Sequence, residues 1–235
     1  MAKRRRGWRH FWDCPECPEL PPDDNHWMHF SRVEEKCIQH AINFVDRCDP
    51  GTEVLFAAYS FTIKELADAL IAAHQRGCIV KVIVEGTRSS SQAKCVICFL
   101  QDAGVEVKQD KVPKYHDDGS YELDEDGDIA WQYKGSTLHH NKYIVEYKED
   151  PETGELSKGA VFTGSFNFSK NAERNWENIL ITRAKDVVLG YRDNFLNAMW
   201  NNPKYFDAIP PEAPVSYKYR GVYNPVDCND PKWWD

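Results

Sequence analysis

The chain has 235 residues, of which 42% are hydrophobic and 28% are charged, so it is long enough for one sizeable core with short extensions. No stretch approaches eighteen uninterrupted apolar residues, and residues 1–10 are basic, which excludes a recognisable signal peptide or membrane anchor. We therefore expect no stable membrane insertion.

The net charge of −8 argues against nucleic-acid binding, but residues 110–128 (eight acids, two bases) and 146–155 (five acids, one base) account for −10. The rest of the chain is slightly basic.

Residues 1–30 form a basic, aromatic and proline-rich segment that we expect to lie outside the main domain. Residues 3–9 hold five bases and no acid, which suits a nucleic-acid-binding arm but is equally typical of a solvated terminus. Four potential metal ligands also fall within sixteen residues, namely Cys14, Cys17, His26 and His29. Their spacing predicts a structural zinc ion in one interpretation and a plain loop in the other.

Alternating helical and strand patterns fill the main domain, which we place at residues 31–203. Two capping boxes, Ser31-x-x-Glu34 and Thr62-x-x-Glu65, predict helix starts. A strand, helix and second strand in this order imply a right-handed parallel crossover. The elements predicted before the central motif are a helix over 31–48, a strand over 53–61, a helix between 62 and 77, a strand over 79–84, a helix over 89–103 and a strand over 105–107.

Eight cysteines follow no regular disulfide framework. Four of them lie within apolar patterns, namely Cys37, Cys78, Cys95 and Cys98. We interpret these as buried thiols in a reducing compartment, which predicts a cytoplasmic location.

The clearest chemistry lies between residues 138 and 178. His140 and Lys142 are two positions apart at the start of an apolar run, so on a strand both side chains leave the same face. That face then carries an imidazole beside an ammonium group. The neighbouring His139 points to the opposite face, and we interpret it as structural.

A second short strand over 160–163 runs into Gly164, where glycine permits a close backbone approach. Ser165 and Asn167 follow and again share a face. A lysine, a hydroxyl and a carboxamide that converge on a histidine form a binding pocket for a phosphate, without any need for a metal ligand. Taken singly, each of these residues is more often a surface or turn residue; the joint pattern favours catalysis.

The pair His140-x-Lys142 and Gly164-Ser165-x-Asn167 resembles the signature of the phospholipase D superfamily, in its small branch with one motif per chain. That branch includes bacterial nucleases and mitochondrial cardiolipin hydrolase-like nucleases. The resemblance covers about residues 31–200. It implies an α/β fold in which a mixed β-sheet is flanked by helices on both faces.

The resemblance also implies a mechanism in which His140 attacks phosphorus and forms a covalent phosphohistidine, with no cofactor required. The family's site uses two motifs and this chain has one, so a homodimer would supply a second histidine as the general acid. Lys142, Ser165 and Asn167 match the phosphate-holding positions of the family. Glu177 matches its downstream acid, which orients the histidine.

One residue departs from the family pattern. The aspartate that follows His-x-Lys in the family is replaced here by Tyr147, with Glu146, Glu149 and Asp150 nearby but out of register. Because that aspartate is mostly a structural partner in the family, we expect the replacement to affect local geometry rather than the chemistry.

After the motif, Lys170 and Arg174 supply bases near the mouth of the pocket, where we expect them to bind substrate. A strand over 176–182 and a helix over 186–200 are predicted to complete the core. Residues 204–235 form a tail rich in proline and aromatic residues, which we expect to wrap over a surface.

These observations favour a metal-independent phosphodiesterase, with a nuclease acting on DNA or RNA as the first hypothesis. A phospholipase D-type lipid hydrolase is the alternative, but it predicts an apolar rim or an amphipathic helix that the sequence does not clearly contain. A nucleic-acid-binding protein that has lost turnover is a third hypothesis, and Tyr147 is its only support.

Overall fold

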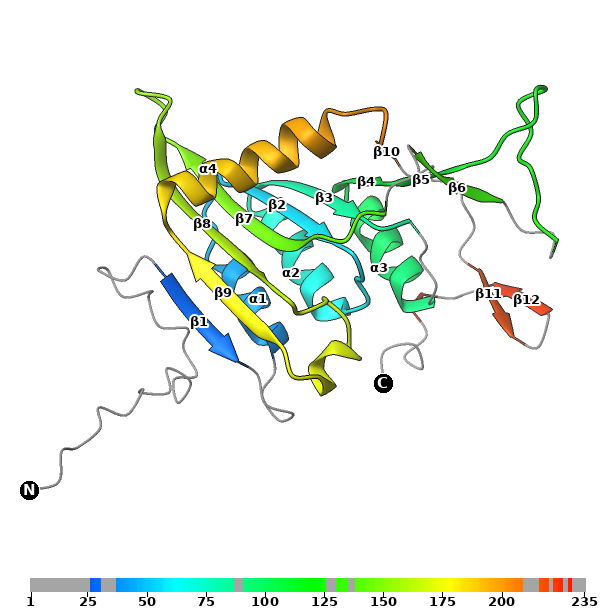
Figure 1. Ribbon diagram of the computed structural model, residues 1–235, viewed down its shortest axis with the longest axis horizontal. Coiled ribbons are helices and arrows are strands. Elements are labelled where there is room, and N and C mark those ends of the chain that lie inside the picture. The colour runs from blue at the N-terminus through cyan, green and yellow to red at the C-terminus, as the bar shows by residue number, and fades with distance from the viewer. Residues whose placement is uncertain are drawn as a thin grey trace, which may run out of the picture.

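An eight-stranded mixed sheet forms the centre of the computed structural model, with the strand order β1-β9-β8-β7-β2-β3-β4-β10 (Figure 1). The structure describes residues 26–30, 37–86, 91–125, 130–134, 138–208, 216–219, 222–225 and 228–229. Strands β2, β3 and β4 run parallel, and each of the other pairings in this sheet is antiparallel.

The strands of the main sheet are β1 (His26–Phe30), β2 (Glu53–Ala58), β3 (Ile79–Val84), β4 (Glu106–Gln109), β7 (Lys142–Glu149), β8 (Leu156–Gly164), β9 (Asn178–Thr182) and β10 (Asp207–Ala208). Two small hairpins are separate from it, β5 (Lys111–Pro113) with β6 (Trp131–Tyr133), and β11 (Ser216–Tyr219) with β12 (Val222–Pro225). The helices are α1 (Cys37–Asp46), α2 (Lys64–Gln75), α3 (Ser91–Asp102), α4 (Lys185–Asp193), the short 3-10 helix η2 (Ala172–Arg174) and the π-helix η3 (Asn194–Trp200).

The helices cover both faces of the sheet, as the alternation of side chains along β2 shows. Val54 and Phe56 of β2 pack in a core with α1, α2 and α3, whereas Leu55 and Ala57 pack on the other face with α4 and η3. Figure 1 shows α4 crossing one face of the sheet, with α1 and α2 beneath the other. The predicted fold class, a mixed sheet flanked by helices on both faces, is confirmed.

Most predicted elements in the main domain are present, with shifted ends. β3 has the predicted bounds, but α2 begins at Lys64 after an N-cap residue, Ile63, that makes no side-chain cap. The capping box at Thr62 is therefore wrong, because the backbone N–H of Thr62 donates instead to the carbonyl of Phe168 at 2.9 Å. The first capping box lies at residues 31–34, outside the described residues.

Two strands of the main sheet come from segments that the sequence suggested were extensions. β1 pairs antiparallel with β9, and β10 pairs with β4, so each forms an outer strand of the sheet. These short edge pairings were not predicted, because their sequences show no clear alternation.

The cysteines differ from the prediction at two positions, Cys95 and Cys98, of which Cys98 is a thiol that is only partly buried. Cys37 and Cys78 are buried, as predicted, but Cys95 is not a thiol: it forms a disulfide with Cys228, 133 positions further along. This bond joins α3 to the C-terminal tail. Because disulfides persist in oxidising compartments, it also weakens the argument for a reducing one.

Candidate active site

The predicted site residues meet at one edge of the sheet, where β7 begins and β8 ends. Lys142 is the first residue of β7, and Gly164 is the last residue of β8, the neighbouring antiparallel strand. Glu177 comes directly before β9, the next strand along. The antiparallel order therefore brings two strand starts and one strand end to the same place.

His140 and Lys142 lie together, as predicted. The Nζ atom of Lys142 lies 3.3 Å from Nδ1 of His140 and donates a hydrogen bond to the His140 carbonyl at 3.2 Å. The His140 side chain is exposed, so a substrate can reach its ring. The pair places an imidazole and an ammonium group at adjacent positions on one surface.

Tyr59, which the sequence analysis did not single out, completes this part of the site. Its ring lies against the His140 imidazole, with a centroid separation of 4.3 Å, and the Lys142 ammonium lies 5.2 Å from the same ring. The backbone N–H of Tyr59 donates to the carbonyl of Asn141 at 2.9 Å. The segment after β2 therefore fixes the position of the His140 segment.

Two opposing effects act on the Lys142 ammonium. Partial burial lowers the pKa of Lys142 below its usual range, and the nearby Glu177 carboxylate raises it again. The Glu177 carboxylate therefore interacts electrostatically with the ammonium group that lies beside His140.

Ser165 connects the glycine turn to Glu177. The Ser165 hydroxyl donates to the Glu177 carboxylate and accepts the backbone N–H of Asn178 at 3.0 Å. The Ser165 backbone N–H donates in return to the Asn178 side chain at 2.9 Å. A Cβ atom at Gly164 would lie 2.0 Å from the Asn178 carbonyl oxygen, so this close approach requires glycine.

Asn167 is positioned by its two neighbours. Phe166 and Phe168 are fully buried, and the Phe168 ring packs at 4.7 Å from that of Phe56 in β2. Asn167 between them is partly buried, and its Oδ1 atom is buried without a hydrogen-bond partner within the described part of the chain. A buried amide oxygen without a partner is costly, and its retention is typical of a functional position.

The two predicted substrate-binding bases follow this segment. Lys170 is partly buried, and Arg174 is exposed at the end of η2. Trp176, directly before Glu177, has 75% of its side-chain surface exposed. The sequence did not single out this indole, and such high exposure is unusual for so large an aromatic side chain.

His139 lies on the opposite side of the loop from His140, as predicted. It is buried, and its backbone N–H donates to Oδ2 of Asp110 at 2.7 Å, while the other oxygen of Asp110 accepts the N–H of Gly86 at 2.8 Å. Burial raises the pKa of Asp110 to about 6, although both backbone hydrogen bonds act to lower it. Asp110 thus ties the end of β3 to the residue before His140.

Tyr147 replaces the family aspartate on the α4 side of β7. Its ring stacks under the Arg192 guanidinium, 3.9 Å from the ring centroid, and Arg192 pairs with Glu53 at 2.6 Å. Its hydroxyl donates to Glu149 at 3.0 Å. Tyr147 therefore contacts a cation, Arg192, at the position where the family has an aspartate, and it lies at the end of β7 opposite to Lys142.

Glu146 occupies the other face of β7. Its carboxylate is buried, with 1% of its side chain exposed, and pairs with Arg47 and Lys158 at 3.0 Å each. Two cations compensate for the burial of this charge, so Glu146 is a structural residue and not part of the site.

The proposed zinc ligands are only partly described. Cys14 and Cys17 lie outside the described residues. His26 and His29 both lie on β1 but on opposite faces, because they are three positions apart. His26 contacts Thr182 at 2.7 Å, and His29 is buried against Trp27 and His40. This placement does not favour one ion shared by both histidines.

The strand order also determines where the two acidic segments lie relative to Lys142 and His139. The turn between β7 and β8, within residues 150–155, lies at the far end of both strands from Lys142 and Gly164. In contrast, residues 110–128 begin directly after β4, close to His139.

Within the part of the chain that the structure describes, no helix is long and apolar enough to cross a bilayer.

The comparisons with known proteins agree with this geometry. Residues 43–200 match the family described as cardiolipin synthase, PLD-like domain. Phospholipase D of Rickettsia felis is 27% identical over 168 residues, which cover 71% of this chain and 66% of that protein. Human mitochondrial cardiolipin hydrolase is 26% identical over 157 residues, which cover 66% of this chain and 48% of that protein. The chain thus spans slightly less than two thirds of the first relative and about half of the second.

Two solved structures share the fold. Nuc of Salmonella typhimurium, a phospholipase D family member, superposes with a TM-score of 0.56 at 20% identity, covering 78% of this chain and 97% of that chain. NucT from Helicobacter pylori superposes with a TM-score of 0.51 at 22% identity, covering 73% and 92%. At these identities the likeness concerns the arrangement of strands and helices.

Proposed function

The chain belongs to the phospholipase D superfamily, through its PLD-like domain, and from this premise we propose that it is a phosphodiesterase that cleaves nucleic acid. The observation that carries the proposal is the convergence of His140, Lys142, Ser165 and Glu177 at one edge of the sheet. An exposed imidazole beside a cation, a hydroxyl and a carboxylate is a suitable site for attack on a phosphodiester.

In the first step a ring nitrogen of His140, in its neutral form, attacks phosphorus. A P–N bond forms, the bond from phosphorus to the leaving oxygen breaks, and that oxygen takes a proton from a general acid. In the second step water attacks the phosphohistidine, and the P–N bond breaks. The water proton passes to the former acid, now acting as a base, and His140 is regenerated.

The general acid in this scheme is His140 of a second copy. One chain supplies a single His-x-Lys pair, and the exposure of His140 supports an arrangement in which a symmetric homodimer brings two such rings to one phosphate. Within one turnover, one ring would act as nucleophile and then leaving group, and the other as general acid and then general base.

The charge on the phosphate is compensated by Lys142, with the amide of Asn167 as a neutral donor, while the Ser165 hydroxyl keeps its hydrogen bond to the Glu177 carboxylate. Glu177 acts through Ser165 and Lys142, which it holds in place. Each preorganised donor of this kind contributes about a hundredfold to a thousandfold in rate. The reaction therefore requires no cofactor, and the Cys14, Cys17, His26 and His29 zinc set would have only a structural role.

Three features support nucleic acid as the substrate. Trp176 exposes its indole next to Glu177, where a base can stack on it. Lys170 and Arg174 follow Asn167 on the same segment and can contact the flanking phosphates. The five bases within residues 3–9 add a sequence-independent contact.

The test compares cleavage of labelled single-stranded DNA, single-stranded RNA, duplex DNA and phospholipid vesicles in excess EDTA. We expect cleavage of a nucleic acid by the native protein and a loss of at least about a thousandfold in His140→Ala. His116→Ala is the matched control, because His116 is an exposed histidine on a turn of the acidic insertion. This control should retain full activity.

Two outcomes contradict the proposal. Cleavage that persists in His140→Ala, or that EDTA abolishes, overturns the histidine mechanism. Cleavage of the vesicles alone overturns the assignment to nucleic acid and favours the lipid hydrolase. Analytical ultracentrifugation of the same samples tests the dimer, since an active monomer contradicts a site shared between two copies.

A further inference from the structure

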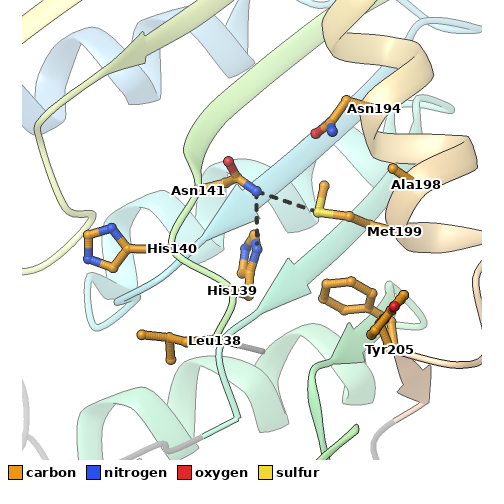
Figure 2. Close-up of a pocket in the computed structure, with 9 residues that line it drawn as sticks. Leu138, His139, His140, Asn141, Asn194, Ala198, Met199 and Tyr205 are labelled. Atoms are coloured by element: carbon orange, nitrogen blue, oxygen red, sulfur yellow. Dashed lines mark hydrogen bonds between the residues drawn. The ribbon is translucent and has the colours of Figure 1, made fainter. Parts of the chain in front are cut away.

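A pocket of about 230 Å³ lies behind the loop that carries His140, on the side of the sheet covered by α4 and η3 (Figure 2). His140 is itself one of its lining residues, although its ring points to the other side of the loop in Figure 2, so the pocket and the imidazole are separated by the backbone of one loop. The other lining residues are Leu138, His139, Asn141, Asn194, Ala198, Met199, Tyr205 and Phe206.

The lining is neutral and partly aromatic. None of the nine described residues that line the pocket is Asp, Glu, Lys or Arg. The rings of His139 and Phe206 pack edge to face at 5.8 Å, and Met199 and Tyr205 form the opposite wall in Figure 2. Such a lining suits an uncharged, planar group and excludes a phosphate or a charged head group, which require compensating charges.

His139 offers this pocket an unused hydrogen-bond donor. Its Nδ1 atom lies 3.4 Å from the Asn141 amide nitrogen, which can only donate, so this contact corresponds to the neutral tautomer that carries its proton on Nε2. That Nε2 atom is buried and has no hydrogen-bond partner among the residues that the structure describes. Burial lowers the pKa of His139 to about 4, with smaller contributions from Lys142 and His140, so the ring stays neutral near pH 7.

The position of the His139 ring is fixed from two sides. The Asp110 carboxylate accepts its backbone N–H, and Asn141 also contacts the sulfur of Met199 at 3.6 Å. A buried N–H group of fixed direction without a partner costs free energy, which a ligand with an acceptor atom would recover. A planar heterocycle with ring nitrogens and carbonyl groups has such acceptors.

We propose that this pocket is a base-binding subsite, which takes the base of the nucleotide adjoining the scissile phosphate. The His139 N–H and the Asn141 amide bond its edge, while Phe206, Tyr205 and Met199 contact its faces. The proposal rests on the nuclease function proposed above and deepens it, because it requires a nucleobase next to the bond that breaks. His139 is then a substrate-binding residue, in addition to its structural place.

The experiment uses three dinucleotides, each with a single phosphodiester. One carries both bases, and each of the other two has an abasic tetrahydrofuran residue on one side of the phosphate. We expect the native protein to cleave one abasic dinucleotide with a kcat/KM about tenfold or more below that of the intact one. Removal of the base on the other side should have a smaller effect.

The variant Ala198→Phe fills the pocket from an exposed position on η3, so it leaves the core intact. We expect it to reduce the ratio of intact to abasic kcat/KM to about one. The matched control is Asn197→Phe, because Asn197 is the exposed neighbour on the same helix and does not line the pocket. The control should keep the native ratio.

The outcomes separate this inference from the function on which it rests. Equal cleavage of all three dinucleotides by the native protein, or a native ratio in Ala198→Phe, overturns the subsite and leaves the nuclease standing. No cleavage of any dinucleotide or polymer, with cleavage of phospholipid vesicles, overturns the nuclease and the subsite together.

Discussion

The ring of Tyr59 lies against the imidazole of His140, with ring centroids 4.3 Å apart and an angle of 52° between the planes. This contact restricts the exposed His140 ring, which also lies against the Lys142 ammonium group. Because the backbone of Tyr59 also binds the carbonyl of Asn141, ring and loop are fixed by the same residue.

We therefore predict that Tyr59→Ala lowers kcat on single-stranded DNA by about tenfold to a hundredfold, with little change in KM, because His140 loses its orientation. Tyr59→Phe keeps the ring and should retain most of the activity. Steady-state kinetics of the two variants provide the check. A loss in Tyr59→Phe as large as that in Tyr59→Ala would show that the hydroxyl, and not ring packing, is what matters.

Gly164→Ala should reduce both stability and activity. The added methyl group would lie 2.0 Å from the Asn178 carbonyl oxygen, so β8 and β9 must separate where Ser165 binds Asn178. We expect a loss of about 1–3 kcal/mol in the free energy of unfolding, measured with urea. Gly190→Ala on α4 is the control, because nothing lies within 4 Å of its added Cβ, and we expect it to stabilise the helix slightly. Equal unfolding midpoints for the two variants would contradict the close approach at Gly164.

Stability should fall as the pH rises past the pKa of Asp110. Burial raises that pKa from 3.8 to about 6 in the folded protein, so the folded state binds the proton more tightly than the unfolded chain does. The resulting stabilisation is complete below about pH 4 and is lost as the pH rises through 6, a change on the order of 3 kcal/mol. The difference in free energy of unfolding between the native protein and Asp110→Asn, measured from about pH 4 to pH 8, isolates this change. A difference that is constant with pH would show that the pKa of Asp110 is not raised.

The Cys95–Cys228 disulfide closes a long loop and should stabilise the fold. We predict that Cys228→Ser lowers the free energy of unfolding by about 2–4 kcal/mol, because the unfolded chain gains freedom. Adding dithiothreitol to the native protein should lower its melting temperature to that of the variant, while the variant itself is insensitive to the reductant. Sensitivity of the variant to dithiothreitol would mean that another cysteine pair is involved.

The sequence predicted those parts of the site that depend on short spacings. His140 and Lys142 share a face because strand geometry fixes residues two apart, and Ser165 follows Gly164 at a turn that only glycine permits. The same reasoning correctly separated His139 from His140. Local patterns carry this information because neighbouring residues impose it.

The residues that the sequence did not reveal depend on contacts between distant segments. Tyr59 reaches His140 only because β2 pairs with β7, and Ala198 lines the pocket only because η3 packs over β7. The predicted capping box at Thr62 was wrong for the same reason. The backbone N–H of Thr62 donates to the carbonyl of Phe168, which lies in the segment between β8 and β9. No periodicity or spacing within one segment encodes these partners.

The negative charge of the acidic turn between β7 and β8 repels an anion over a range that depends on ionic strength. β7 extends from Lys142 to Glu149, so at roughly 3.4 Å per residue the turn lies more than about 20 Å from the Lys142 end. The screening length at physiological ionic strength is only about 8 Å. A polyanion near Lys142 therefore experiences little repulsion from that turn in the cell, whereas in dilute buffer, with screening lengths of about 30 Å, the same turn would slow its approach.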